Sequence, residues 1–269
     1  MEVYAVGMKI VDLRVYPVKS CRGRSVETAT IAARGFQSDR RAMIVAQDGS
    51  FVSQRTHPNL TQIEVDCTSG MSLSVEGQDV NVSFERDRKT VRVWNDEVSA
   101  RIADEAVNSI LSEFLGEPVC LVSMDDASHR TTSTAFGAEN AVSFADGFPY
   151  LITTTASLRA LGETAGEEIP MDRFRSNIVI ETETPWIEDS WSTLDIDGVK
   201  FDLVKPCTRC VMTTLDQKTG KQVGKTTMEA LIKTRARSGD WGKGVVFGVN
   251  AIARTVGGTI SRGMTVRAE

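Results

Sequence analysis

Short runs of alternating or apolar residues, separated by turn residues, fill the first ninety-odd positions of the chain. These runs cover residues 8–15, 26–31, 42–45, 63–65, 71–75, 80–84 and 91–94. Glycine-containing turns near positions 23, 35, 49, 70 and 77 divide them. Many short strands at this spacing are typical of all-β units, so the pattern predicts a small β-barrel or sandwich.

The clearest helical period lies between Ala100 and Leu115, where apolar residues recur on a single helical face. Gly116 follows at the position where a C-terminal cap belongs. The pattern therefore predicts a helix over residues 100–115. The next segment, 125–140, is polar, rich in Ser and Thr and only weakly periodic, so we expect a long surface loop that could cover a site.

The second half of the chain mixes strand and helix patterns. We expect strands at 150–154, 177–181, 201–204, 211–215, 245–253 and 259–266, and a hairpin at 194–199. A short helix is predicted at 155–161, with Thr154 or Thr155 as its N-cap. The capping-box spacing of Thr226 and Glu229 predicts a second helix that extends to about Arg237. The chain is therefore predicted to be mainly β with a few helices, an α+β fold.

Composition and charge narrow the class of protein. Hydrophobic residues make up 41% of the 269 positions and charged residues 25%, which is ordinary for a soluble globular protein. The formal charge of −5 argues against a nucleic-acid polymer as partner, because that would need a basic face. No apolar run approaches the length of a membrane span, and the N-terminus lacks a signal-peptide pattern. We expect a cytoplasmic protein without a membrane partner, whose five cysteines are reduced.

The segment Pro206-Cys207-Thr208-Arg209-Cys210 places two thiols on either side of an arginine. A zinc site would need four ligands, but the other three cysteines are isolated and the chain has two histidines. A thioredoxin-like dithiol would need a helix after the first cysteine, whereas the residues after Cys210 favour a strand. One thiolate could instead ligate a soft, redox-active metal or carry a persulfide, with Lys205 and Arg209 favouring the charged form. Both thiols could equally be small buried hydrophobes.

Basic residues also recur beside predicted core strands. They occur in the segments Lys19-Ser20, Asp39-Arg40-Arg41, Gln54-Arg55 and Arg173-Phe174-Arg175. In an acidic protein such arginines are candidates for binding an anion such as a phosphate, because the guanidinium offers paired donors. Each could also be an ordinary member of a surface ion pair.

Together, these motifs resemble the MOSC-domain family with its N-terminal β-barrel companion, and most closely the YcbX-type bacterial proteins and mitochondrial amidoxime-reducing components. In order, they are Tyr16-Pro17-Val18-Lys19-Ser20-Cys21, residues 35–40, residues 144–149, Arg173-Phe174-Arg175-Ser176-Asn177, residues 188–191, Pro206 to Cys210 and Phe247-Gly248-Val249-Asn250. The resemblance extends over about residues 8–267. It implies an N-terminal β-barrel-like domain at residues 8–98 and a MOSC β-barrel domain at residues 99–269.

The resemblance implies a molybdenum-cofactor-dependent enzyme that reduces N-hydroxylated compounds, such as amidoximes, hydroxylamines and N-hydroxylated nucleobases, in a detoxification role. By resemblance, Cys210 is the molybdenum ligand and Cys207 is not. The family's pterin and phosphate contacts fall on Lys19, Ser20, Arg40, Arg175 and Asn177, with Thr208 and Arg209 beside the metal ligand. Asp146 lies next to the metal in the family's pattern and is the candidate for positioning water or shuttling protons.

Departures from the family pattern affect the expected partners. Ser176 replaces a usual proline, and Met264 stands where an acidic residue often occurs. No Cys-x4-Cys-x2-Cys run is present, so we expect no fused 2Fe–2S domain and expect electrons to come from a separate ferredoxin- or flavin-type reductase. MOSC domains also occur in cofactor sulfurases, so a carrier of the molybdenum cofactor or of a persulfide on Cys210 is an alternative. A third possible function is that of a structural or protein-interaction β-barrel.

Overall fold

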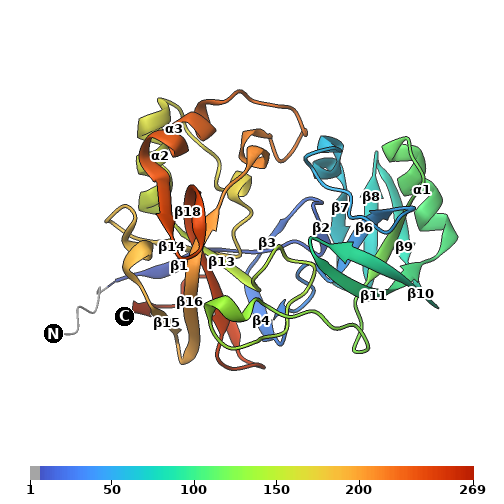
Figure 1. Ribbon diagram of the computed structural model, residues 1–269, viewed down its shortest axis with the longest axis horizontal. Coiled ribbons are helices and arrows are strands. Elements are labelled where there is room, and N and C mark those ends of the chain that lie inside the picture. Colours follow the sequence, from blue (N-terminus) through green and yellow to red (C-terminus); the bar gives the residue numbers. More distant parts are fainter. Residues whose placement is uncertain (1–6) are drawn as a thin grey trace.

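The computed structural model describes residues 7–269 and confirms a mainly β fold with three α-helices in that range (Figure 1). The strands form four sheets, and the two larger ones belong to two modules that lie side by side in Figure 1. None of the four sheets closes on itself within residues 7–269, so the expected barrels take the form of open, curved sheets.

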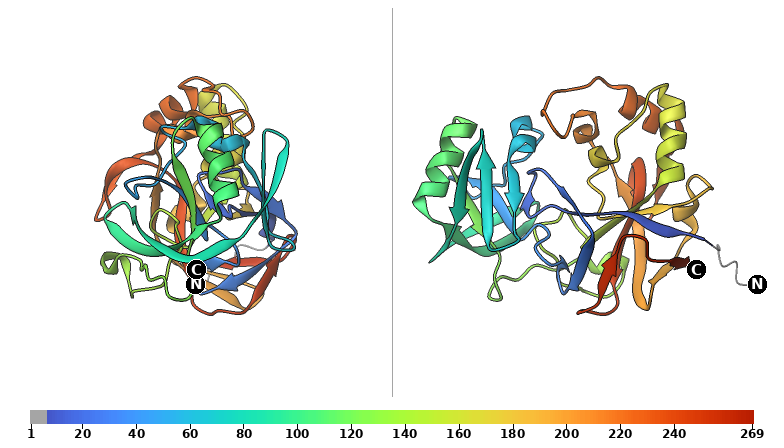
Figure 2. Two further views of the ribbon diagram at one scale, coloured as in Figure 1. Left: turned by 90° about the vertical axis from the view of Figure 1, so that its right-hand side faces the viewer. Right: turned by 180° about the vertical axis from the view of Figure 1, so that it is seen from behind.

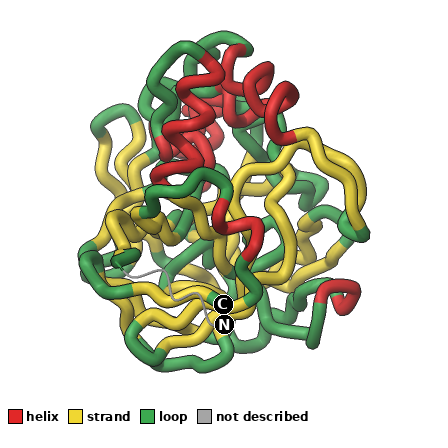
Figure 3. The backbone as a smooth tube through the Cα atoms, turned by 90° about the vertical axis from the view of Figure 1, so that its left-hand side faces the viewer, coloured by secondary structure: helices red, strands yellow, loops and turns green. Residues whose placement is uncertain are grey.

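The second module is built on a nine-stranded sheet. Its order is β20 (Val266–Ala268), β15 (Thr193–Ile196), β16 (Val199–Thr208), β18 (Gly242–Ala253), β13 (Tyr150–Thr154), β14 (Ile178–Glu181), β1 (Lys9–Val15) and β3 (Arg24–Val26), with β17 (Ala236–Gly239) also paired to β18. The first strand of the chain therefore belongs to the sheet of the second half, where β1 pairs antiparallel with β14. Helices α2 (Thr155–Ala165) and α3 (Thr226–Arg235) pack together at one end of this sheet (Figure 3).

The first module contains a five-stranded sheet, a three-stranded sheet and one helix. The larger sheet has the order β10 (Phe84–Val93), β11 (Asp96–Ala103), β12 (Val119–Ser123), β6 (Ala42–Ala46) and β2 (Val18–Lys19). The smaller has the order β7 (Glu64–Asp66), β8 (Met71–Val75) and β9 (Gln78–Val82), and α1 (Glu105–Leu115) packs against both. The predicted boundary between residues 98 and 99 falls inside β11, so a division there would cut this strand.

A third small sheet and five short 3-10 helices complete the described chain. The sheet has the order β19 (Thr259–Ser261), β4 (Thr28–Ala32) and β5 (Gly35–Phe36). The 3-10 helices are η1 (Pro58–Gln62), η2 (Thr134–Phe136), η3 (Met171–Phe174), η4 (Ile187–Ser190) and η5 (Val211–Thr214). Because β19 comes from the end of the chain and β4 from its beginning, this sheet ties the two ends of the sequence together.

Several local predictions are confirmed. Gly116 ends α1 in the left-handed conformation at φ 74°, which glycine adopts without a steric penalty. Thr154 caps α2, because its side chain accepts a hydrogen bond from the Ser157 backbone N–H. The segment 125–140 is largely irregular, with η2 inside it.

Three other local predictions are wrong. Residues 100–103 belong to β11, and α1 begins only after Asp104, whose side chain caps the Val107 N–H. The predicted strand at 211–215 is η5, in which the Thr213 and Thr214 hydroxyls donate to backbone carbonyls three residues earlier and so favour a turn. The capping box at α3 does not form, because Lys225 is the N-cap and the Thr226 hydroxyl donates to Glu167 instead.

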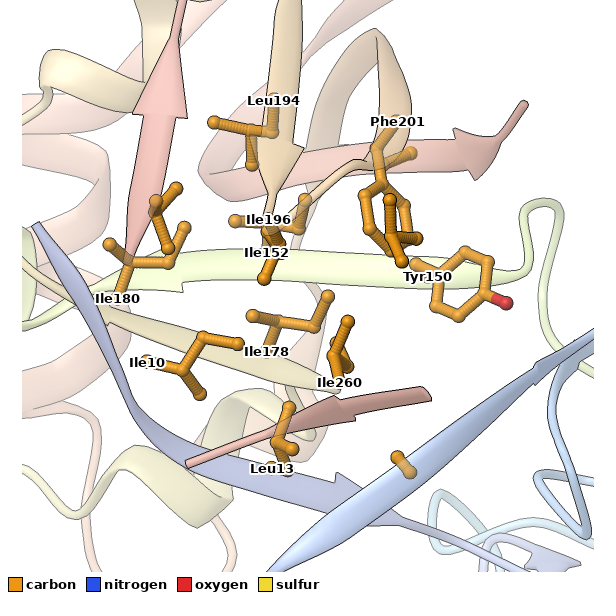
Figure 4. Packing of buried hydrophobic residues seen from close by; sticks show 14 of the residues in the cluster. Ile10, Leu13, Tyr150, Ile152, Ile178, Ile180, Leu194, Ile196, Phe201 and Ile260 are labelled. Atoms are coloured by element: carbon orange, nitrogen blue, oxygen red, sulfur yellow. The ribbon is translucent and has the colours of Figure 1, made fainter. Parts of the chain in front are cut away.

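The core of the second module holds β1, β13 and β14 together (Figure 4). Ile178 lies fully buried on β14, between its neighbours on β1 and β13. We expect Ile178→Ala to lower the free energy of unfolding by about 2–5 kcal/mol, because the lost packing leaves a cavity that the sheet cannot fill. Urea denaturation measures this. Ile232→Ala, at a side chain that is 57% exposed on α3, is the control and should change stability by less than about 0.5 kcal/mol. Equal losses in both variants would contradict this description of the core.

Candidate active site

A cavity of about 460 Å³ lies between the two modules. The first module contributes Lys19 at the end of β2, Arg40 before β6 and Trp94 after β10. The second contributes the residues after η3 and the end of β16. All nine residues predicted from the sequence line this one cavity: Lys19, Ser20, Arg40, Asp146, Arg175, Asn177, Thr208, Arg209 and Cys210. The fold therefore brings together residues as far apart in the sequence as Lys19 and Cys210.

The charge of the cavity is opposite to that of the whole chain. Its basic lining residues are Lys19, Arg40, Arg55, Arg173, Arg175, Lys205 and Arg209, and Asp146 is the single acidic one. The chain as a whole has a formal charge of −5. Seven cations around one carboxylate create a strongly positive potential, which favours an anionic ligand.

Arg175 is the clearest indication that an anion belongs here. Its side chain is only 8% exposed. One terminal nitrogen donates to the Cys21 carbonyl at 2.8 Å and to Gln217 Oε1 at 3.3 Å, whereas the other has no partner among the described residues. Burial, together with the nearby Arg40, lowers the pKa of Arg175 to about 10, so it remains charged at neutral pH. A buried cation with a free donor is costly unless a ligand accepts from it.

Tyr16 holds the Arg175 and Arg40 side chains together. Their guanidinium carbons lie 4.3 and 4.5 Å from the centre of its ring. Arg40 also donates to Asp39 at 2.6 Å and to the Asn177 side-chain oxygen at 3.1 Å. The Asn177 amide donates in turn to the Arg14 carbonyl. Asn177 therefore fixes the position of Arg40 at the edge of the cavity.

The backbone at this site adopts conformations that are uncommon for residues with a Cβ. Within residues 7–269, eight non-glycine residues have positive φ, and four of them line the cavity: Ser20 at 69°, Arg40 at 49°, Trp94 at 58° and Arg175 at 55°. Each such residue costs roughly 1–3 kcal/mol and persists only where its surroundings hold it. Arg40 is held by its N–H, which donates to the Tyr16 carbonyl at 2.8 Å. Their concentration here is typical of a functional site.

Lys19 and Asp146 form an ion pair across the cavity wall. Lys19 Nζ lies 2.5 Å from Asp146 Oδ1 and 2.8 Å from the Phe144 carbonyl oxygen. The Asp146 side chain itself is 69% exposed to the cavity. The surrounding protein would raise the pKa of this carboxyl, but the Lys19 ammonium, with Arg40 and Arg55, lowers its pKa well below the usual range. Asp146 is therefore a carboxylate at neutral pH and can accept hydrogen bonds there.

The two thiols of the Cys207 and Cys210 pair lie next to different arginines. Arg209 donates to Cys207 Sγ at 3.0 Å and to the Phe174 carbonyl at 2.8 Å. Arg55, from the first module, approaches Cys210 Sγ at 3.6 Å. Cys207 is thus engaged by an arginine of its own segment, whereas Cys210 faces the other module across the cavity.

The family motifs do not include Arg55 and Trp94. Arg55 belongs to one of several basic segments beside predicted strands, and Trp94 follows β10 of the first module. Here the Arg55 guanidinium lies 5.0 Å from the Trp94 ring centre, and Trp94 Nε1 donates to Asp146 at 3.3 Å. Their role depends on the packing of one module against the other, for which no local sequence signal exists.

The segment 125–140 contributes no lining residue to the cavity. Its nearest approach is indirect, because the Phe136 ring lies 4.7 Å from Lys205 Nζ, and Lys205 lines the cavity. The loop therefore does not cover the cavity, and it contacts the site at Lys205. Across residues 7–269, no helix has both the length and the apolar character needed to cross a membrane.

Two β modules with a cation-rich cavity and a half-buried thiol between them define the class of protein. Residues 7–118 match the MOSC N-terminal beta barrel domain, and residues 139–267 match the MOSC domain. The chain belongs to the MOSC-domain family and contains both of its domains.

Curated relatives support this assignment. The chain is 28% identical over 263 residues to mitochondrial amidoxime-reducing component 1 of Mus musculus. The aligned region covers 89% of this chain and 76% of that protein. The human protein of the same name is 29% identical over 242 residues, with coverage of 82% and 70%. The molybdenum cofactor sulfurase of Danio rerio is 30% identical over 267 residues, which cover 89% of this chain but 31% of that much longer protein.

Proposed function

We propose that this protein is a molybdenum-cofactor-dependent reductase of N-hydroxylated compounds that receives its electrons from a separate redox protein. The main observation in support is that the Cys210 thiol shares one cavity with Arg175, a buried guanidinium with a free donor. The names of the relatives, amidoxime-reducing components and molybdenum cofactor sulfurases, support the cofactor and the type of substrate. A cytoplasmic location is part of this proposal.

The residues present fit the proposed cofactor. Its phosphate is a dianion, and Lys19, Arg40 and Arg175 offer converging charged donors at the edge of the cavity. Ser20 and Asn177 would complete the contacts to the phosphate and pterin, while Thr208 and Arg209 would lie beside the metal ligand. A thiolate is the ligand type that a soft, redox-active metal prefers. Cys210, the ligand that the family resemblance implies, would supply it from the side of the cavity that faces the first module.

The reaction sets clear requirements for the protein. Reduction of an N–OH group breaks the N–O bond, consumes two electrons and two protons, and releases the amine or amidine together with water. When bound, the molybdenum cofactor would supply the two-electron chemistry and a Lewis acid for the oxygen. Asp146, held as a carboxylate by Lys19, would accept hydrogen bonds from the substrate N–H or from a water molecule and so orient it. Its low pKa favours this positioning role over that of a proton donor at neutral pH.

Turnover of one defined substrate tests the proposal. Protein from a host that makes the molybdenum cofactor is expected to convert benzamidoxime to benzamidine with dithionite-reduced methyl viologen as electron donor. Protein that contains molybdenum and pterin but produces no benzamidine, and does not reduce hydroxylamines or N-hydroxylated nucleobases, would contradict it.

The similarity to molybdenum cofactor sulfurases favours a second candidate, in which the protein carries the cofactor or a persulfide on Cys210. The same cavity would serve to hold the cofactor without turnover. Intact-mass spectrometry separates the candidates, because a persulfide adds one sulfur atom that a reducing agent removes and that Cys210→Ala protein lacks.

A further inference from the structure

The segment that follows Cys210 carries a concentration of positive charge that is unusual for this chain. Residues 205–243 contain nine basic and three acidic residues, whereas the rest of the chain contains 22 basic and 33 acidic residues. Within this stretch, residues 216–225 form a loop between η5 and α3, here called the strap. Lys218, Lys221 and Lys225 are its exposed cations.

The charges of the strap are not neutralised within the molecule. None of its three lysines forms an ion pair with any residue of 7–269. The acidic residue in the strap, Asp216, does not pair with a lysine side chain of the described chain. Its carboxylate accepts hydrogen bonds from the backbone N–H groups of Lys218 at 3.0 Å and Thr219 at 2.7 Å. The lysines are therefore available to an acidic partner.

Two exposed apolar side chains belong to the same stretch of the chain as these lysines. Val211, the first residue of η5, is 52% exposed, and Val223 in the strap is 37% exposed. The strap folds back onto η5, because the Val223 N–H donates to the Thr214 carbonyl at 2.9 Å and Leu215 pairs with Gln222. Apolar groups next to charged ones are typical of a protein interface, where the charges steer the encounter and the apolar groups provide contact. We call Val211, Lys218, Lys221, Val223 and Lys225 the strap surface.

The strap is held in place by Arg22 and by η1 of the first module. Gln62 of η1 donates to the Thr219 carbonyl at 3.0 Å, and Arg22 donates to the Lys218 carbonyl at 2.7 Å. Gly220 lies so close to the Pro58 carbonyl that a Cβ there would be 2.5 Å from its oxygen. In Figure 1 and the rear view of Figure 2, the strap is the orange loop that arches from η5 to α3. It therefore offers a preformed surface, and little ordering is needed on binding.

We propose that the strap surface is the docking site of the electron donor, and that this donor is an acidic redox protein. This inference rests on the reductase function proposed above. Val211, the first residue of the strap surface, directly follows Cys210, whose carbonyl accepts from the Thr213 N–H of η5 at 3.2 Å. The strap surface therefore begins next to the residue that would ligate the metal. Electron-transfer complexes are small and transient, and they use complementary charge to align the partners quickly. A basic surface with two exposed apolar side chains, in an otherwise acidic protein, matches those requirements.

Charge reversal tests this assignment. The variant Lys218→Glu/Lys221→Glu/Lys225→Glu changes only residues outside the cavity. The control, Arg86→Glu/Lys200→Glu/Arg267→Glu, makes the same change in net charge at three exposed residues that form no ion pair within residues 7–269. The probes are two acidic donors, a plant-type 2Fe–2S ferredoxin and a flavodoxin. Binding is measured by biolayer interferometry at low salt, and donor-driven benzamidoxime reduction is measured in parallel, both with the holoprotein.

We expect the strap variant to lose at least about tenfold in donor affinity and in donor-driven rate, because reversed charges repel the acidic partner. The control variant should lose much less. Equal losses in the two variants, no loss in the strap variant, or failure of both donors to bind the unmodified protein would overturn the docking assignment. Methyl viologen needs no docking surface, so the rate of benzamidoxime reduction with this donor should be unchanged in both variants. Absence of viologen-driven turnover in the unmodified protein would count against the reductase function, while the binding data would still decide the docking site.

Discussion

Cys210→Ala is expected to abolish both metal binding and reductase activity. Substitution of the outer partners of a metal ligand already lowers metal affinity or activity by about 10–100-fold, so loss of the ligand itself should cost more than about 100-fold. The fold should survive, because Cys210 is only half-buried and the hydrogen bond to its thiol within residues 7–269, from Arg55 at 3.6 Å, is long. The measurements are molybdenum per chain and the viologen-driven rate of benzamidoxime reduction.

Cys207→Ala is the matched control for that experiment. Cys207 lies three positions earlier, is also half-buried, and contacts Arg209 rather than a residue of the other module. We expect this variant to keep its molybdenum and most of its activity. If Cys207→Ala lost the metal and Cys210→Ala kept it, the assignment of the ligand would be reversed. If both variants kept full activity, a thiolate-bound metal would have no role.

Arg175→Met should have the second largest effect, on cofactor retention. A hydrogen bond to a charged group contributes about 1.5–3 kcal/mol, so loss of the guanidinium should weaken cofactor binding by roughly ten- to a hundredfold. Stability should not fall in parallel, because the guanidinium has no carboxylate partner in the described chain and methionine can fill the space against Tyr16. The measurements are pterin content after dialysis and the free energy of unfolding of the cofactor-free protein.

Arg14→Met separates this effect from a general effect of charge. Arg14 is a partly buried arginine that pairs with Asp12 outside the cavity, so its loss should leave the pterin content unchanged. Retention of the cofactor by Arg175→Met, with the same content as Arg14→Met, would show that the free donor of Arg175 does not serve the phosphate.

The sequence predicted elements well where a single local pattern determined them. The alternation at 71–75 and the apolar run at 150–154 correspond to β8 and β13 without a shift, and Gly116 and Thr154 end and begin helices as expected. Errors occurred where tertiary structure overrode the pattern. Residues 100–103 continue the helical period of α1, but pairing with β10 and β12 draws them into β11. The β-branched residues after Cys210 favour a strand, yet threonine hydroxyls that bond back to the backbone stabilise a turn.

The site residues also divide into those that sequence motifs identify and those that only the tertiary structure brings in. The nine site residues assigned from the family resemblance all line one cavity, because the spacing of the family's motifs encodes a shared fold. Arg55 and Trp94 come from the first module and reach Cys210 and Asp146 only after the two modules pack. The free donor of Arg175 and the unpaired lysines of the strap are likewise invisible in the sequence, since they depend on which neighbours are absent as well as on which are present.

The most direct test of the central claim is the amount of molybdenum and pterin bound per chain in unmodified protein from a cofactor-competent host. A cavity that presents seven cations, a buried guanidinium with one free donor and the Cys210 thiol predicts molybdenum and pterin in equal, near-stoichiometric amounts. Folded protein from the same host that contains neither, and that does not take up the cofactor when it is supplied, would contradict the proposed site.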